Sequence, residues 1–268
     1  MINPQEFKIR CSSIYKIMGG SVGLSESQLK EKTTLETRKN DPEAKPLTDK
    51  MLARLDELIF IESNPDLPQG AKTYCQEWLK ARIYGEQPRT DFKYTSKGLE
   101  MEDDALAFVA ENYVYGMLLK NDIRKDGEFI TGEADNVQPD HTIDTKCSWS
   151  PSSFPLFETE LDSAYYWQGL GYMYLYKKPN HKVFYCLMNT PDHLIESEFK
   201  SLDYKNGYSE DEAESVYNDL LKKMTFDDLD PKVRIKLFEI EFDQKKINQV
   251  IERVKLCRDY IKKLLCKL

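Results

Sequence analysis

The 268-residue chain is 40 % hydrophobic and 12 % aromatic, and its formal net charge at pH 7 is −8. This aromatic content is typical of a folded protein, and the length is sufficient for one large core. No apolar run approaches the roughly 18–20 residues that span a bilayer, and the N-terminal stretch lacks the apolar segment of a secretory signal. We therefore expect a cytoplasmic protein without membrane contact.

The charge and the cysteines argue against two further classes. A net charge of −8 disfavours a passive coat for nucleic acid, because phosphate binding favours positive surface, but it is compatible with an enzyme that has a local basic groove. The six cysteines include no CxxC pair of the kind that binds zinc, and the chain has only three histidines. We expect reduced, mostly buried thiols.

The N-terminal third, residues 1–93, is predicted to be mostly helical. Apolar residues recur at helical spacing over 47–60, and a second helix over 71–85 ends at Gly85. Polar loops that contain proline precede these two helices, at 38–48 and 62–70.

The middle of the chain, residues 94–190, combines helices and strands. A helix is predicted over 96–113, and another over 160–178 that stops before Pro179. Between them, three short runs bounded by turns predict a β-meander, and a further strand follows the second helix. The predicted strands cover 115–124, 128–137, 142–147 and 181–189.

The C-terminal part, residues 191–268, is predicted to contain a helix, a strand and a final helix. Ser209 and Glu212 have capping-box spacing at the start of a helix over 209–224, and 235–242 alternates like a strand. The final amphipathic helix, 243–268, carries many basic side chains, for which a solvated face is the first interpretation and a DNA-backbone contact the alternative. These are Lys245, Lys246, Arg253, Lys255, Arg258, Lys262, Lys263 and Lys267.

The predicted turn between 128–137 and 142–147 brings charged side chains together. On the second strand Asp144 and Lys146 share one face, since side chains alternate. Asp135 lies at the end of the preceding strand, which we expect to be its antiparallel neighbour. Two adjacent carboxylates repel unless a cation lies between them, and hard oxygen ligands favour Mg²⁺ or Mn²⁺. The alternative is a surface hairpin with ordinary salt bridges.

Two helices add polar candidates to this hairpin. Glu102 lies in line with the apolar stripe of helix 96–113, where a carboxylate needs a cation or a hydrogen-bond partner. The alternative is a helix-dipole role, which Asp103 and Asp104 fulfil equally well. On the later helix Gln168 and Tyr172 share a face, and there the alternative is an aromatic core with a surface amide.

In this order the residues resemble the PD-(D/E)XK nuclease superfamily, and within it the lambda-exonuclease and YqaJ-type viral recombinase family, with RecB-like nuclease domains as wider relatives. The resemblance covers about residues 7–20 and 94–190. The matching elements are Gly98-x-x-x-Glu102-x-x-Ala105, Ala134-Asp135-Asn136, Asp144-Thr145-Lys146-Cys147, Gln168-x-x-x-Tyr172, and Arg10-Cys11-Ser12-Ser13 followed by Gly19.

The chain departs from the family pattern at three positions. Ala134 and Asn136 replace the usual proline and glycine around the first aspartate, and Asp144 replaces the commoner glutamate. An aspartate is one methylene shorter than a glutamate, which alters the geometry available to a metal.

The resemblance implies a fold and an activity. The fold is an α/β (α+β mixed-sheet) restriction-endonuclease-like core, helix-strand-strand-strand-helix-strand, with helical additions at both ends of a single nuclease domain over 1–268. The activity is a Mg²⁺-dependent deoxyribonuclease that digests linear duplex DNA from the 5′ end in phage-type recombination or repair. The alternatives are an endonuclease on the same core, or a catalytically silent protein that binds DNA or another protein.

The resemblance also implies roles for single residues. Asp135, Asp144 and the Thr145 carbonyl would bind metal, with Glu102 acting directly or through water, and Lys146 would orient the attacking water. Arg10, Ser12 and Ser13 would hold a DNA phosphate, while Gln168 and Tyr172 would support the site or the strand.

The resemblance further implies partners and cofactors. The implied partners are a single-strand annealing protein and a ring-shaped homotrimer. Some relatives carry an iron–sulfur cluster on four cysteines. Here only Cys257 and Cys266 are close in sequence, so we expect no cluster.

Overall fold

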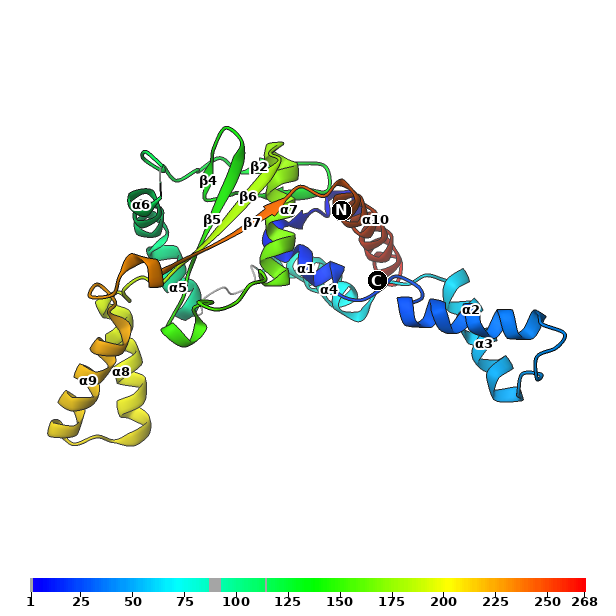
Figure 1. Ribbon diagram of the computed structural model, residues 1–268, viewed down its shortest axis with the longest axis horizontal. Helices are drawn as coiled ribbons and strands as arrows, with labels where there is room; N and C mark the ends of the chain where they lie inside the picture. Colours follow the sequence, from blue (N-terminus) through cyan, green and yellow to red (C-terminus); the bar gives the residue numbers. More distant parts are fainter. Residues whose placement is uncertain (1, 87–92, 114) are drawn as a thin grey trace. The chain divides into compact units, whose positions relative to one another are not determined.

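The computed structural model describes residues 2–86, 93–113 and 115–268 (Figure 1). The chain divides into two units. One comprises Met1–Ile9, Ser13–Gln87 and Asn248–Leu268, and the other comprises Arg10–Ser12 and Pro88–Ile247. The single nuclease domain over 1–268 stays a prediction. Among the described helices, none is both long and apolar enough to cross a membrane.

Helices dominate the first unit, as the sequence predicted. They are α1 (Ile14–Met18), α2 (Glu26–Asn40), α3 (Asp49–Ser63), α4 (Gln69–Tyr84) and most of α10 (Gln244–Leu265). Helix α2, which the sequence analysis did not single out, packs on α3 through Leu35, Leu55 and Leu58. Helix α4 ends as predicted at Gly85, whose φ of 67° lies in the left-handed region that glycine adopts without strain.

Two arginines of α10 correct the prediction of a wholly solvated basic face. Arg253 and Arg258 are buried, and their guanidinium groups donate to main-chain carbonyls of the same unit. Arg253 reaches the carbonyls of Ile17 and Gly20, and Arg258 reaches that of Phe7 at 3.0 Å. These two cations therefore hold the N-terminal segment, and they are not available to DNA.

A four-stranded sheet forms the core of the second unit (Figure 1). Its order is β4-β5-β6-β7, and only the central pair β5–β6 is parallel. Helix α7 (Ser163–Tyr176) makes the crossover between the two parallel strands. The strands are β4 (Asn136–Val137), β5 (His141–Cys147), β6 (Asn180–Cys186) and β7 (Ile235–Glu241). A smaller sheet has the order β1-β3-β2, with β1 (Ile9–Arg10), β2 (Lys125–Asp126) and β3 (Ile130–Gly132).

Helices cover both faces of the larger sheet. Ile143 and Phe184 point to the face where α6 (Glu102–Asn112) buries Ala105, Leu106 and Val109. The side chains that alternate with these two along β5 and β6 point to the opposite face of the sheet, which α7 covers. Asp144 lies on that face. This mixed α/β architecture is the predicted fold class.

Three predicted elements differ in the structure. The strand predicted over 128–137 is divided between the two sheets, as β3 and β4, so Asp135 lies just before β4 and not at the end of one long strand. The helix predicted over 96–113 is interrupted at Met101, between α5 (Lys93–Glu100) and α6. The strand predicted over 115–124 is absent from the described residues 115–124. The Asn121 N–H donates to the Asp135 carbonyl at 2.7 Å, and side-chain amides make further contacts: Asn136 donates to the Leu119 carbonyl at 2.7 Å, and Asn121 to that of Ala134 at 2.9 Å.

A helical hairpin follows β6 in the second unit. It consists of α8 (Asp192–Asn206), which was not predicted, and α9 (Glu210–Met224), which was. The predicted capping box of Ser209 and Glu212 is present. Phe199 and Tyr217 join the helices edge to face, with ring centroids 5.5 Å apart.

The contact between α7 and β6 depends on a glycine. A Cβ atom added at Gly169 would lie 2.3 Å from the buried ring of His181 and 2.7 Å from Ile240. Alanine favours a helix over glycine by about 1 kcal/mol, but this clash outweighs that gain, since overpacking costs about 1–3 kcal/mol or more. We expect Gly169→Ala to lower the free energy of unfolding in urea.

The matched control is Gly98→Ala in α5, where nothing lies within 4 Å of the added Cβ. This variant is expected to be as stable as the wild type or about 0.5–1 kcal/mol more stable. An unchanged or higher stability for Gly169→Ala would contradict the packing described.

Candidate active site

The structure places Asp135, just before β4, across from Asp144 on β5. The antiparallel register pairs Asn136 with Ile143. The residue before Asn136 and the residue after Ile143 are the two aspartates, which therefore lie opposite one another. The Asp135 carboxylate accepts from the main-chain N–H of Thr145 at 2.6 Å and from its hydroxyl at 3.0 Å. The first aspartate is thereby fixed against the strand that carries the second.

Burial raises the pKa values of both aspartates. Asp144 is 2 % exposed. Burial, with the neighbouring Asp144 charge, raises the pKa of Asp135 to about 6, although Lys146 opposes this. Burial likewise raises the pKa of Asp144, against the effect of Lys146. Burial and the proximity of the two carboxylates thus outweigh the effect of the Lys146 charge.

Lys146 lies beside the pair, on the same face of β5. Its ammonium forms an ion pair with the Asp144 carboxylate, and its side chain remains 21 % exposed. Burial lowers its pKa, but the charges of Asp144 and Asp135 outweigh this and raise the pKa above its ordinary value. Lys146 is therefore a cation that can donate hydrogen bonds, at the border of the buried pair and the solvent.

Glu102, in the first turn of α6, is a third carboxylate, and it lies near Asp135. Burial and the nearby Asp135 charge raise the pKa of Glu102. Its carboxylate accepts from Lys120 at 2.8 Å. Lys120 was not among the predicted site residues, because it lies in the segment taken for a strand and no local pattern links it to Glu102.

Gln168 and Tyr172 are buried behind Asp144. The Gln168 amide approaches the Asp144 carboxylate at 3.4 Å and donates to the Tyr172 hydroxyl at 2.8 Å. Both side chains are about 5 % exposed. This placement suits support of the aspartate, and it leaves little surface for contact with DNA.

The predicted phosphate-binding element lies on both units. Arg10 and Ser12 belong to the second unit and are exposed, whereas Ser13 belongs to the first. Cys11 between them is buried against Gly132, where an added Cβ would lie 2.5 Å from its Sγ. Within the second unit, Cys11 is thus fixed next to β3, the strand that precedes Asp135.

Lys97 is a buried cation that the sequence analysis did not single out. Its side chain is fully buried, and its ammonium donates to the carbonyls of Ser148 and Trp149 at 3.0 and 3.3 Å. These carbonyls directly follow β5. Burial lowers the pKa of Lys97 to about 8.

We expect Lys97 to make stability depend on pH. In the unfolded chain a lysine has a pKa of about 10.4, so between about pH 8 and 10.4 the unfolded state binds more protons and the free energy of unfolding gains a positive slope with pH. Urea unfolding at pH 7.5 and 10 should show this contribution in the wild type and not in Lys97→Met. Equal slopes for the two proteins would contradict it.

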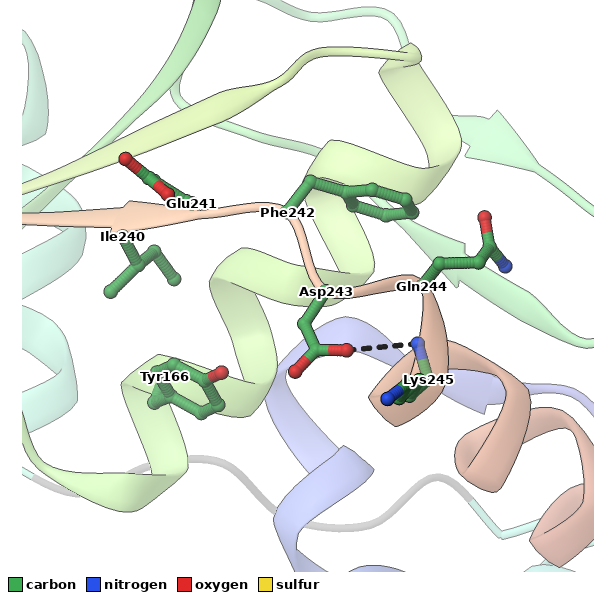
Figure 2. Close-up of a pocket in the computed structure, with 7 residues that line it drawn as sticks. All are labelled: Tyr166, Ile240, Glu241, Phe242, Asp243, Gln244 and Lys245. Atoms are coloured by element: carbon green, nitrogen blue, oxygen red, sulfur yellow. Dashed lines mark hydrogen bonds between the residues drawn. The ribbon is translucent and has the colours of Figure 1, made fainter.

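A pocket of about 720 Å³ lies on another side of α7 (Figure 2). Tyr166 and residues 240–245 line it, and Asp243 there caps the start of α10 by accepting from the Lys245 N–H at 2.8 Å. Tyr166 and Gln168 are two residues apart and so do not share a helix face. Since none of the predicted site residues is among those lining it, we assign the pocket no part in the site.

The donor chemistry of the site fits a hard divalent cation. In the described part of the chain, no group of three or more His, Cys, Asp or Glu side chains is already arranged to hold a metal. Glu102 pairs with Lys120 and Asp144 with Lys146. Carboxylate oxygens are nevertheless the ligands that Mg²⁺ prefers, and two adjacent carboxylates favour a cation between them.

Glu102, Asp135, Asp144 and Lys146 lie close together beside a mixed sheet that helices cover. The chain is similar to a phage-related exonuclease from Haemophilus somnus 129PT, at 26 % identity with a TM-score of 0.69, over 97 % of this chain and 96 % of that one. This likeness confirms the predicted fold class and the resemblance to phage-type exonucleases.

A second solved protein shares the fold. An alkaline exonuclease from Laribacter hongkongensis, solved also in complex with dAMP, aligns over 97 % of this chain and 94 % of that one, with 12 % identity and a TM-score of 0.52. No protein-family model matches this sequence, and no curated protein sequence is significantly similar to it.

Proposed function

We propose that this chain is a Mg²⁺-dependent deoxyribonuclease that degrades linear duplex DNA from its 5′ ends, in phage-type recombination or repair. The observation that carries the proposal is the buried Asp144 with the half-buried Asp135 opposite it and Lys146 on the same strand face. The similarity to a phage-related exonuclease over nearly the whole chain supports it. Mn²⁺ is expected to substitute for Mg²⁺.

The residues that would hold the metal lie around β5. Asp135 and Asp144 are the expected ligands, with Glu102 acting directly or through water. The N–H and C=O of one residue in an extended strand point to the same edge, so the Thr145 carbonyl faces the side where its N–H meets Asp135. A bound metal would activate water and stabilise negative charge on the phosphoryl group.

The chain's own residues would position the reactants. The raised pKa of Lys146 keeps it protonated, so it would orient the attacking water by donating a hydrogen bond and would not act as a base. Gln168 would hold the Asp144 carboxylate in place. Arg10, Ser12 and Ser13 would bind a DNA phosphate. The water oxygen would bond to phosphorus as the bond from phosphorus to the leaving oxygen breaks, with the water's proton passing to solvent and the leaving oxygen taking a proton from solvent.

The uneven distribution of charge along the chain reconciles the net charge of −8 with DNA binding. The whole chain has 46 acidic and 38 basic side chains, and residues 192–230, which include the α8–α9 hairpin, contain 12 acidic and 4 basic ones. The remaining residues therefore contain 34 of each. The net charge of −8 belongs to this hairpin region, and the rest of the chain is balanced.

The experiment that tests this proposal compares linear and closed-circular duplex DNA in Mg²⁺, with labels on the 5′ or 3′ ends. We expect loss of the linear DNA alone, with early release of the 5′ label. Early release of the 3′ label would reverse the proposed direction, and cutting of the circle would favour an endonuclease. Intact DNA in both Mg²⁺ and Mn²⁺ would favour a silent binding protein. The homotrimer, the annealing partner and the cytoplasmic location stay predictions.

A further inference from the structure

An aromatic ring lies next to the lysine of the candidate active site. The Lys146 ammonium is 5.0 Å from the ring centroid of Tyr165, within the range of a cation–π contact. Tyr165 lies in the first turn of α7, three residues before Gln168, so both side chains are on the face that looks toward β5. The Asp162 side chain fixes the start of this helix by accepting from the Ala164 N–H at 2.7 Å.

The ring of Tyr165 is itself held by other rings. It packs edge to face on Tyr185 of β6, with centroids 5.8 Å apart and an interplanar angle of 79°. Tyr185 packs in the same way on Phe238 of β7, at 5.8 Å and 73°. The parallel register sets Tyr185 beside Lys146. Three rings from a helix and two strands therefore form a fixed wall next to the flexible lysine side chain.

We propose that Tyr165 is a positioning residue that holds the Lys146 ammonium at the site through the face of its ring. Among the described residues, the ammonium contacts Asp144 and this ring. A cation bound to Asp144 would compete for the same carboxylate oxygens and weaken the ion pair. The ring does not bind a hard cation through oxygen, so it would keep the ammonium in place when the carboxylate is shared. This role rests on the proposed function.

Three variants separate the ring from the rest of the tyrosine. Tyr165→Phe keeps the ring, Tyr165→Leu removes it, and Tyr166→Leu is the matched control on the next residue. We expect Tyr165→Leu to lower kcat about tenfold with little change in KM, since a desolvated cation–π contact has about this effect. Tyr165→Phe and Tyr166→Leu should stay near the wild type. A wild-type kcat in a folded Tyr165→Leu would overturn the proposal.

A spectroscopic measurement tests the contact without any cleavage. In protein labelled with ¹³C-lysine, the ε-protons of Lys146, assigned with Lys146→Arg, should be shifted upfield by the ring current of residue 165. The shift should persist in Tyr165→Phe and disappear in Tyr165→Leu. An unshifted Lys146 in the wild type would overturn the proposal even if the leucine variant fails to fold. If no DNA is cleaved, the proposed function fails, and this measurement still decides the contact.

Discussion

Lys146→Ala is expected to lower the rate of DNA cleavage by about 10²–10⁴-fold, the range found when a positioned proton donor or a charge-stabilising group is removed. The ammonium borders both the buried carboxylates and the solvent, where an attacking water would lie. Its loss leaves a half-buried gap at the edge of β5, and the packing of Ile143 and Phe184 on the other face is untouched. The fold should therefore survive the substitution.

The measurement is the single-turnover rate on linear duplex DNA, with thermal unfolding to check the fold. Lys182→Ala is the matched control, since Lys182 lies on the adjacent strand β6 and pairs with Glu239 at 3.1 Å, away from the two aspartates. We expect the control to cleave at the wild-type rate. Full activity in a folded Lys146→Ala protein would refute the role given to this lysine.

Asp144→Asn is expected to abolish both cleavage and the stabilisation of the protein by Mg²⁺. The asparagine keeps the size of the side chain, but it removes one of the two carboxylate charges that would bind the metal. At a Mg²⁺ concentration of 100 times Kd, binding stabilises a protein by about 2.7 kcal/mol, which raises the Tm of a chain of this size by about 5–10 °C. Wild-type protein should show this rise, and the variant should not.

Asp140→Asn makes the same chemical change elsewhere in the same hairpin. Asp140 is exposed and pairs with the His141 ring at 2.7 Å. This control should keep both the Mg²⁺-dependent rise in Tm and the activity. If Asp144→Asn responded to Mg²⁺ as the wild type does, the aspartate pair would not be the metal site.

The hairpin of Asp135, Asp144 and Lys146 was predictable because its signals are local. Period-two alternation set the lysine and the second aspartate on one face, and the short turn made the two strands neighbours. The structure has the same pairing. The order of helices and strands in the core was predictable for the same reason, since each element carries its own pattern of apolar residues.

Other features depend on contacts that no local pattern specifies. The prediction of a strand over 115–124 was wrong because this segment is joined to its neighbours by the Asn121 N–H and by the side-chain amides of Asn121 and Asn136, without a regular ladder. Lys120 meets Glu102 across 18 residues. The burial of Arg253 was hidden in a helix whose other basic residues resemble a solvated face, because its partners lie more than 230 residues away in the chain.

The central claim is that the aspartates of this hairpin form a metal-dependent site for cutting DNA. The most direct test incubates linear duplex DNA with the wild type and with Asp144→Asn, each in Mg²⁺ and in EDTA. We expect the wild type to cleave the DNA in Mg²⁺, and we expect intact DNA in the other three reactions. Cleavage that persists in EDTA or in the variant, or a wild type that leaves the DNA intact in Mg²⁺, would contradict it.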